Sequence, residues 1–350
     1  MPAAGAKLLE TRYVIPQVRG RGHGLGNELI PWARALLAAQ LLGARLLPPA
    51  FGRNRRRYGR HFGTPRYDWL RNRLLQHLLP RFDFTEADWR AHGAGDVVAA
   101  LQAYAREHDL AGRERYVLTT SGMWGGYRHI EAARTPVRAL LAASRFAPGN
   151  LRRIAARLDP ARITVALHVR LGDFRAAGSG TDYRGNWNTT LPLGWYVSIA
   201  RQLQRGLGSA VQFLVVSDGR ADQLRPLLEA VPCVSTADIP DSDCSDLLAL
   251  ADADLLVCSV SSYSQWAAFL SDAPYLWYAP NLQRDAAGRG SIWGAADPAP
   301  AGTGLPRGIA IGAEGALPEE LLTLLAARRV VQWPGNDLVR GGSVTLGPAG

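Results

Sequence analysis

The residues best suited to chemistry follow one apolar run at positions 163–169. His168 lies near the end of this run, and Arg170 and Asp173 come directly after it. Side chains alternate along a strand, so we expect His168 and Arg170 on the same face. Arginine binds phosphate through two parallel hydrogen bonds. The spacing therefore predicts a site for a phosphate-bearing ligand. The alternative is a salt bridge between Arg170 and Asp173.

A strand end of this kind becomes a binding site when the strand belongs to an open parallel sheet. Apolar runs and amphipathic segments alternate through the second half of the chain. We expect strands at 163–169, 211–217, 232–235, 254–260 and 274–278, and helices at 192–206, 220–230, 245–252, 262–271 and 316–329. This alternation predicts a parallel sheet covered by helices.

The first half carries a weaker version of the same pattern. We expect a strand at 8–18, a glycine-rich turn at 20–27, and a helix from Glu28 to Leu42. Further on we expect an irregular basic stretch at 51–80, helices at 85–107 and 135–158, a strand at 115–120, and a loop at 284–310. The 350 residues are too many for one typical core. We therefore expect two domains, one at 1–155 and one at 156–335, followed by a flexible tail at 336–350. The first domain includes an Arg-rich insertion at 51–73.

The glycine turn includes Gly24, Gly26 and Asn27. It is neither a G-x-G-x-x-G fingerprint nor a P-loop, because Asn27 stands where the last glycine would be and no Gly-Lys follows. Glycines at a strand-to-helix turn still allow a ligand to approach the backbone. Asn27 is expected either to donate to such a ligand or to cap the turn.

A second strand end carries hydroxyl groups in the segment Ser261, Ser262, Tyr263 and Ser264. The amides and the dipole of a helix start favour an anion there, and the three serine hydroxyls add donors. The simpler alternative is that one serine is an N-cap. No G-x-S-x-G elbow supports a hydrolase serine.

Acidic residues near this segment allow two further interpretations. Asp246 begins a helix, where its carboxylate either stabilises the dipole or accepts two hydrogen bonds from a guanine edge. Two Asp-x-Asp strings, at 241–243 and 252–254, are of a type that can hold a divalent cation against a diphosphate. Such strings are short and frequent by chance.

The net charge of +10 is compatible with nucleic-acid or membrane partners. Lys7 is the only lysine, so part of the basicity reflects residue usage. Eight arginines with one acid between Phe51 and Arg73 are expected to form a groove for an anionic or sugar acceptor, a surface for lipid head groups, or a solvated basic face. The sequence shows no signal peptide or membrane-spanning run, and its three cysteines fit a cytoplasmic setting.

Together these motifs resemble the fucosyltransferase superfamily with the GT-B fold, which includes α-1,2-, α-1,6- and protein O-fucosyltransferases. The string from His168 to Asp173 is similar to its H-x-R-x-x-D motif. The spacing from Asp246 to Ser261 and Ser262 matches a second nucleotide motif, and the segment 261–270 is closest to the α-1,2 branch. The turn before Glu28 resembles the G-x-x-G-N-Q turn of that branch.

The resemblance implies two Rossmann-like α/β domains whose parallel sheets face each other across a cleft. It implies that Arg170 holds the β-phosphate of GDP, and that His168 and Asp246 contact the guanine. Ser261, Ser262 and the following helix start (Tyr263 and Ser264) complete the phosphate cradle. Asn27, in the turn with Gly24 and Gly26, faces the diphosphate or the reacting centre from the N-terminal domain, which supplies the acceptor side.

Three positions depart from the family pattern. Gly178 stands where some α-1,6 relatives have a glutamate base, and Leu171 stands where many relatives have a second arginine. The Arg-rich insertion has no counterpart in the family pattern. The base is therefore left open among Asp173, Asp182 and Glu28.

We expect an inverting, metal-independent glycosyltransferase that moves L-fucose from GDP-fucose to a hydroxyl of a glycan or small-molecule acceptor. Arg170, Asn27 and Asp173 are the expected catalytic residues. We expect no cofactor, no metal and no nucleic acid, and peripheral contact with the inner membrane if the acceptor is lipid-linked. The alternatives are a metal-dependent or other nucleotide-sugar enzyme, and a non-enzymatic basic module for nucleic acid or membrane.

Overall fold

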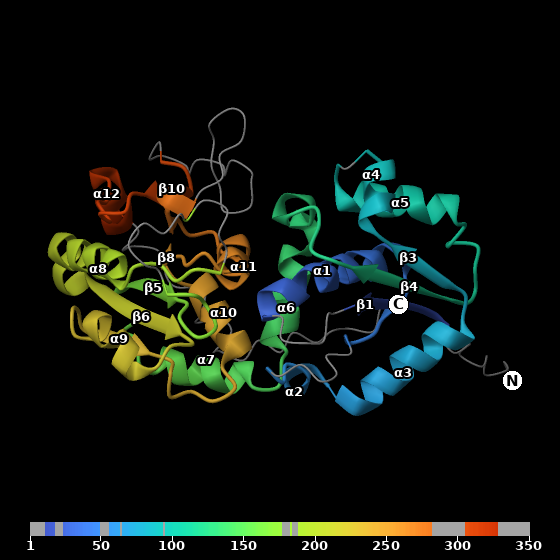
Figure 1. Ribbon diagram of the computed structural model, residues 1–350, viewed down its shortest axis with the longest axis horizontal. Helices are drawn as coiled ribbons and strands as arrows, with labels where there is room; N and C mark the ends of the chain where they lie inside the picture. The colour runs from blue at the N-terminus through green and yellow to red at the C-terminus, as the bar shows by residue number, and fades with distance from the viewer. Residues whose placement is uncertain are drawn as a thin grey trace, which may run out of the picture. The chain divides into compact units, whose positions relative to one another are not determined.

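The computed structural model describes residues 11–17, 24–49, 56–63, 65–93, 95–176, 183, 188–281 and 305–327. The chain divides into two compact units, Met1–Arg145 and Phe146–Gly350 (Figure 1). Each unit contains one sheet in which every pair of neighbouring strands is parallel. The predicted α/β class with two parallel sheets is confirmed.

The first unit has a four-stranded sheet in the order β2-β1-β4-β3. Its strands are β1 (Arg12–Gln17), β2 (Arg45–Leu46), β3 (Arg81–Phe84) and β4 (Tyr116–Ser121). Its helices are α1 (Leu25–Leu42), α2 (Gly59–Phe62), α3 (Pro65–Leu78), α4 (Glu86–Ala91), α5 (Val97–Glu107) and α6 (Arg134–Ala142). Two short 3-10 turns, η1 (Tyr127–His129) and η2 (Glu131–Ala133), precede α6.

Helices lie on both faces of this sheet. Helix α1 contacts β1 and β4 on one face and is buried on most of its surface, as expected of a helix that is apolar all round. On the other face, Leu75 and Leu79 at the C-terminal end of α3 pack against Ile15, Leu47 and Val117. The first unit is therefore a layered α/β unit built around α1.

The second unit has a six-stranded sheet in the order β10-β9-β8-β5-β6-β7. Its strands are β5 (Ile163–Val169), β6 (Val211–Ser217), β7 (Cys233–Ser235), β8 (Leu255–Val257), β9 (Tyr275–Tyr278) and β10 (Gly308–Ile311). Its helices are α7 (Ala147–Ala155), α8 (Leu193–Leu207), α9 (Ala221–Leu228), α10 (Asp243–Ala251), α11 (Ser262–Leu270) and α12 (Glu319–Ala327), with 3-10 turns η3 (Gly208–Ala210) and η4 (Ala279–Asn281).

Strand β5 lies inside this sheet and every one of its residues is buried. A strand covered on both faces reads as a continuous apolar run, which is why its limits could be predicted. Helices α8, α9 and α12 join one apolar core with the sheet. Helix α10 contacts both α7 and α11, and these three helices lie on the opposite face of the sheet (Figure 1).

Several predicted elements need correction. The predicted irregular stretch at 51–80 is wrong, because α2 and α3 lie within it. The predicted helix at 85–107 is two helices, since Thr85 and Asp96 each cap a separate helix start. The predicted helix at 135–158 is likewise α6 followed by α7. The predicted loop at 284–310 is wrong at its end, where β10 pairs with β9.

The chain divides before α7, whereas the sequence predicts a boundary after it, between 155 and 156. The glycine positions 20–23, Asp182 and the predicted tail at 336–350 lie outside the described residues. No helix in the described part of the chain is long and apolar enough to cross a membrane.

A buried arginine organises the first unit. Arg34 on α1 is fully buried and donates to the carbonyl oxygens of Ser121 and Gly122 at 3.0 and 3.2 Å. It also donates to the carbonyl of Trp124, and its guanidinium lies 3.5 Å from the centre of that indole ring. Burial lowers the pKa of Arg34 to about 9. One side chain thus ties α1 to the loop that follows β4.

Replacing this arginine should destabilise the protein. We expect Arg34→Met to lower the free energy of unfolding by about 3 kcal/mol, because buried carbonyl groups lose a charged donor. Urea unfolding measures this change. Arg106→Met, an exposed arginine on α5, is the matched control and should stay within about 0.5 kcal/mol of the wild type. Equal unfolding midpoints for the two variants would contradict the role given to Arg34.

Candidate functional site

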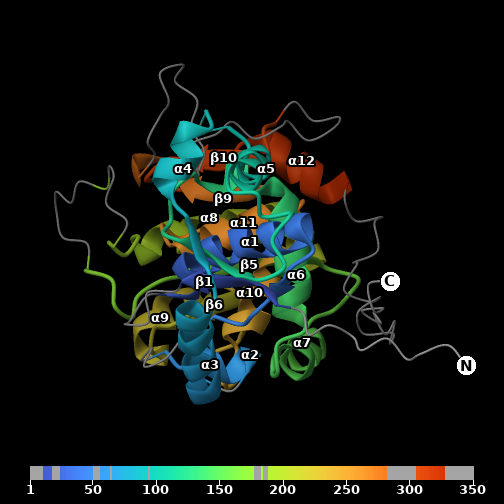
Figure 2. The same ribbon diagram turned by 90° about the vertical axis from the view of Figure 1, so that its right-hand side faces the viewer.

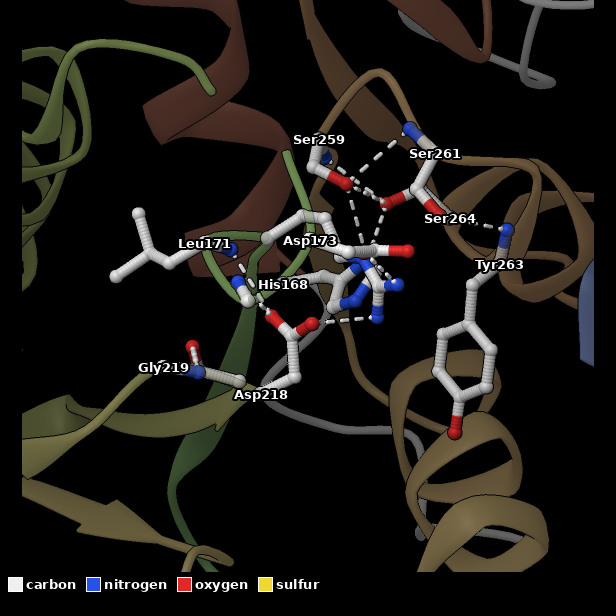
Figure 3. A network of polar contacts seen from close by, with 12 residues as sticks. His168, Leu171, Asp173, Asp218, Gly219, Ser259, Ser261, Tyr263 and Ser264 are labelled. Carbon is white, nitrogen blue, oxygen red and sulfur yellow. Dashed lines mark hydrogen bonds and ion pairs between the residues drawn. The ribbon is translucent and has the colours of Figure 1, made fainter. Parts of the chain in front are cut away.

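The candidate site lies at the place where strand order reverses in the second sheet. From β5 the chain continues to β6 and β7 on one side, whereas β8, β9 and β10 lie on the other side. Ligands of open parallel sheets bind beyond the carboxyl ends of the strands at such a reversal. His168 lies near the end of β5, and Arg170 directly follows that strand. The segment 259–264 follows β8, and Figure 3 shows its serines beside His168. The structure therefore brings the two predicted strand ends together.

His168 is buried and joined to the segment after β8. Its Nδ1 lies 2.6 Å from Ser264 Oγ and 3.2 Å from Ser259 Oγ (Figure 3). Burial and, to a lesser extent, the positive charge of Arg170 lower the pKa of His168 to about 3. The ring is therefore neutral at physiological pH. Because Nδ1 already contacts the serines, Nε2 is the nitrogen through which His168 would meet a ligand.

Two tyrosines hold these strand ends in place. The buried hydroxyl of Tyr196 on α8 lies 3.1 Å from the His168 carbonyl oxygen and 3.4 Å from that of Cys258. It thus links β5 to the residue that follows β8. The Tyr263 hydroxyl donates to the Asp243 carbonyl, which fixes α11 to α10. The Tyr263 and His168 rings are 5.0 Å apart.

The serines of this segment have different roles. Ser261 is the N-cap of α11, and its Oγ accepts a hydrogen bond from the Tyr263 amide at 3.1 Å. Ser261 therefore has the N-cap role that the sequence analysis gave as the simpler alternative to an anion site. Ser264 is fully buried and accepts from the Ser259 amide at 2.9 Å. Ser262 is partly exposed at the first position of the helix. The start of α11 can therefore offer amide groups and Ser262, while Ser264 positions His168.

Arg170 is held by two carboxylates. Its guanidinium lies 2.5 Å from Asp173 Oδ1 and 2.7 Å from Asp218 Oδ2, and it also contacts the ring face of Phe174. Arg170 Nε is buried without a hydrogen-bond partner among the described residues. The salt bridge between Arg170 and Asp173 is the alternative that the sequence allowed. Asp218, which directly follows β6, is a second partner of Arg170.

Asp218 is the more firmly placed of the two carboxylates. Its Oδ1 accepts hydrogen bonds from the Leu171 and Gly172 amides at 2.9 and 3.1 Å (Figure 3). A Cβ at position 172 would lie only 2.3 Å from Asp218 Oδ2, so this approach requires glycine. The Asp218 side chain is 28% exposed, against 56% for Asp173. An incoming phosphate can therefore take the place of Asp173 while Asp218 keeps Arg170 oriented.

Asp246 is a buried acid with an incomplete set of hydrogen bonds. Its Oδ2 accepts from Ser242 Oγ at 2.7 Å, whereas Oδ1 is buried without a hydrogen-bond partner in the described part of the chain. Burial raises the pKa of Asp246 to about 7, against the opposing effects of the Ser242 and Thr236 hydroxyls. A carboxyl in this state is unusual in a purely structural helix start, since buried polar groups are generally paired.

The Asp-x-Asp strings have local roles that differ from metal binding. Asp254 Oδ2 accepts a hydrogen bond from the Thr164 amide at 2.8 Å, next to the start of β5. The carbonyl oxygens of Asp241 and Pro240 accept from the Asn150 side chain. Within the described ranges, no group of three or more His, Cys, Asp or Glu side chains is arranged to hold a metal ion.

The remaining predicted residues belong to the first unit. Helix α1 begins at Leu25, with Gly24 as its N-cap, so Gly26 and Asn27 lie in its first turn. The prediction that Asn27 caps the turn is therefore wrong. Pro31 has no amide hydrogen, so the Asn27 carbonyl receives no helical hydrogen bond from that position. Glu28 is buried on the same helix.

Sequence reasoning missed two residues that shape the site: Asp218 and Tyr196. The limits of β6 were predicted, and Asp218 follows that strand directly. Recognising β6 as the neighbour of β5 would have placed Asp218 beside Arg170. The contact of Tyr196 with two strand ends depends on the packing of α8, for which the sequence has no local signal.

No protein-family model and no curated protein sequence matches this chain. Among solved structures it is similar to POFUT1 in complex with GDP-fucose (12% identity, 76% of this chain and 97% of that one, TM-score 0.42). It is also similar to NodZ α-1,6-fucosyltransferase soaked with GDP-fucose (15%, 79% and 96%, TM-score 0.45) and to fucosyltransferase NodZ from Bradyrhizobium (16%, 74% and 93%, TM-score 0.44). These TM-scores are below 0.5, so the likeness does not establish a function for this chain.

The two partners of Arg170 should respond differently to substitution. We expect Asp218→Asn to weaken GDP binding about tenfold, because Arg170 loses the charged partner that orients it. Asp173→Asn should leave the affinity unchanged or raise it, because Asp173 competes with phosphate for the guanidinium. Isothermal titration calorimetry with GDP measures both variants. An equal loss of affinity in the two would contradict the distinction.

The stability of the protein should depend on pH through Asp246. Between about pH 4 and pH 7 this carboxyl is ionised in the unfolded chain but protonated in the folded one, so unfolding becomes easier as the pH rises. Asp246→Asn removes this effect. The variant should gain up to about 4 kcal/mol relative to the wild type across that window, with no further gain above it. Urea unfolding from about pH 4.5 to about pH 8 measures the difference.

Both proteins retain His168, whose lowered pKa acts in the opposite direction. Its contribution favours folding above about pH 6.5 and is lost as the pH falls toward 3. The comparison cancels this common contribution. A constant difference between the two proteins at every pH would contradict the raised pKa of Asp246.

Proposed function

We propose that this chain is an inverting, metal-independent glycosyltransferase that transfers L-fucose from GDP-fucose to a hydroxyl of a glycan or small-molecule acceptor. The single observation that carries the proposal is the convergence of Arg170, His168 and the start of α11 at the strand-order reversal between β5 and β8. This is the position at which an open parallel sheet binds a nucleotide.

Arg170 supports binding of the diphosphate. It is an oriented guanidinium beside a helix N-terminus, and both groups attract phosphate oxygens. Asp218 fixes the guanidinium from behind, while the more exposed Asp173 occupies the position that we assign to the β-phosphate. The buried and unpartnered Nε adds a further donor on the same side chain.

His168 and Asp246 support recognition of the base. The neutral imidazole of His168 can contact the guanine through Nε2. The carboxyl of Asp246 has one buried oxygen without a partner, and a guanine edge offers two donors to such a group. We propose that this nucleobase completes the hydrogen bonds of Asp246.

The reaction follows from this placement. The bond between the anomeric carbon and the β-phosphate oxygen breaks, and GDP leaves with the electron pair. Negative charge grows on the β-phosphate as it leaves, and Arg170 and the α11 amides stabilise that charge. The acceptor oxygen forms its bond on the opposite face of the sugar, and its proton passes to a base. Asp173 lies beside Arg170 on the leaving-group side, so we do not assign it as this base.

We propose that the first unit serves the acceptor. Gly24, Gly26 and Asn27 lie at the start of α1, where a helix N-terminus can face an anionic group. We also propose a cytoplasmic location, in keeping with a sequence that has only three cysteines and no C-x-x-C spacing, and no nucleic-acid partner. The string at 252–254 does not favour the metal-dependent alternative, because the Asp254 carboxylate already accepts a hydrogen bond from the Thr164 amide.

The test is release of GDP from GDP-fucose, measured with and without EDTA. We expect Arg170→Ala to reduce this release by on the order of 10²–10³, the usual effect of losing a donor to developing charge. EDTA should have no effect. Arg220→Ala, an exposed arginine just beyond β6, is the matched control and should retain wild-type activity.

Arg170→Lys keeps the charge but loses the two-pronged geometry, and should still bind GDP. A wild-type protein that neither releases GDP nor binds it would overturn the proposal. Binding of GDP without release from GDP-fucose would overturn the donor sugar alone. Loss of activity in EDTA would favour the metal-dependent alternative.

A further inference from the structure

Helix α3 presents apolar side chains to solvent and polar side chains to the protein. Among the described residues, six large apolar side chains are exposed, and five of them lie on this helix. They are Tyr67 (64% exposed), Trp69 (47%), Leu70 (61%), Leu74 (53%) and Leu78 (66%). Soluble surfaces rarely gather apolar side chains in this way without a partner.

The inner face of α3 is held largely by polar contacts. Asn72 Nδ2 donates to the Pro48 carbonyl at 2.9 Å, and Gln76 Oε1 accepts from Gln17 Nε2 at 2.7 Å. Leu75 and Leu79 supply the apolar part of this attachment. The helix is therefore anchored to the sheet without using the five exposed side chains.

The outer side chains form one stripe. Positions 67, 70, 74 and 78 are separated by three, four and four residues, which places them on a single face of a helix. Trp69 lies further round the helix. The stripe runs along the whole described length of α3, which lies at the edge of the first unit (Figures 1 and 2).

Basic side chains border the stripe on both sides. Arg71 lies on one side, and Arg73 and His77 on the other. The guanidinium of Arg71 lies 5.8 Å from the centre of the Tyr67 ring, and that of Arg73 lies 5.3 Å from the centre of the Trp69 ring. The only acid of the helix, Asp68, is buried and paired with Arg71 at 3.0 Å. The exposed surface of α3 is therefore apolar and positively charged.

We propose that α3 binds an anionic membrane surface and lies in the plane of its head groups. An apolar stripe bordered by arginines, with tryptophan and tyrosine beside it, has the side chains needed at this boundary. The leucines enter the acyl region, while the arginines reach the lipid phosphates.

The charges on α3 favour a membrane surface over two other partners, a second copy of α3 and the C-terminal residues of the same chain. A second copy of α3 would bring arginine-bordered faces together, with no exposed acid on either helix. The last twenty residues of the chain contain one acid and one arginine, Asp337 and Arg340, and so do not complement a basic face. An anionic lipid surface complements both the apolar and the charged parts of the helix. This proposal is independent of the catalytic one.

The test is co-sedimentation of the full chain with vesicles. Vesicles of phosphatidylcholine with about 25% phosphatidylglycerol should bind the protein, and pure phosphatidylcholine should bind it weakly. We expect Leu70→Gln together with Leu74→Gln to reduce binding at least about tenfold. Arg73→Glu should reduce it by about fivefold to tenfold, and raising the salt from about 0.1 M to about 0.5 M should weaken wild-type binding.

Matched controls lie elsewhere on the surface. Met123→Gln removes the sixth exposed apolar side chain, and Arg153→Glu reverses an exposed charge on α7. Neither should change vesicle binding. Urea unfolding of the double leucine variant should match the wild type, because the two side chains are exposed.

Three results would overturn the proposal. The first is a wild-type protein that does not bind anionic vesicles. The second is a fall in the unfolding midpoint of the double leucine variant, which would mean that another segment of the chain covers the stripe. The third is a dimer, seen by sedimentation velocity, that becomes a monomer in that variant, which would make α3 a contact between copies.

Discussion

Strand order in the second sheet reverses between β5 and β8, so the helices that follow these two strands lie on opposite faces of the sheet. The strand ends at the reversal are therefore not covered by a single crossover, and polar residues can stand there. Tyr196 fixes the spacing of the two ends through their carbonyl groups, and Ser264 fixes the ring of His168. Each proposed contact with the nucleotide depends on this arrangement, because it brings together residues that are far apart in the chain.

The sequence predicts some parts of this fold well for a physical reason. The limits of β5 and β6 agree with the prediction because both are buried on both faces and read as unbroken apolar runs. Helix α3 was missed for the opposite reason. Its polar residues at 68, 72 and 76 face the sheet, so its apolar residues do not mark a core. A periodic pattern shows that a helix has two faces, but not which of them is buried.

The site residues also divide into those that the sequence could predict and those that it could not. His168, Arg170 and Ser261 could be chosen from residue type and spacing, since each lies next to a strand end or a helix start. Asp218 could not be chosen in this way, because its partner Arg170 is 48 positions earlier in the chain. Only the parallel pairing of β5 with β6 brings the two residues together. The charge state of Asp246 was equally out of reach, because it depends on burial by α10 and its neighbours rather than on local sequence.

The raised pKa of Asp246 has a consequence for the donor site. In the proposed complex a guanine edge would bind the ionised carboxylate, so below about pH 7 the nucleotide would expel a proton from Asp246 as it binds. Affinity for the donor then falls about tenfold for each unit of acidification below that point. A single buried carboxyl would thus make binding at the proposed donor site depend on pH near neutrality, with weaker binding below about pH 7.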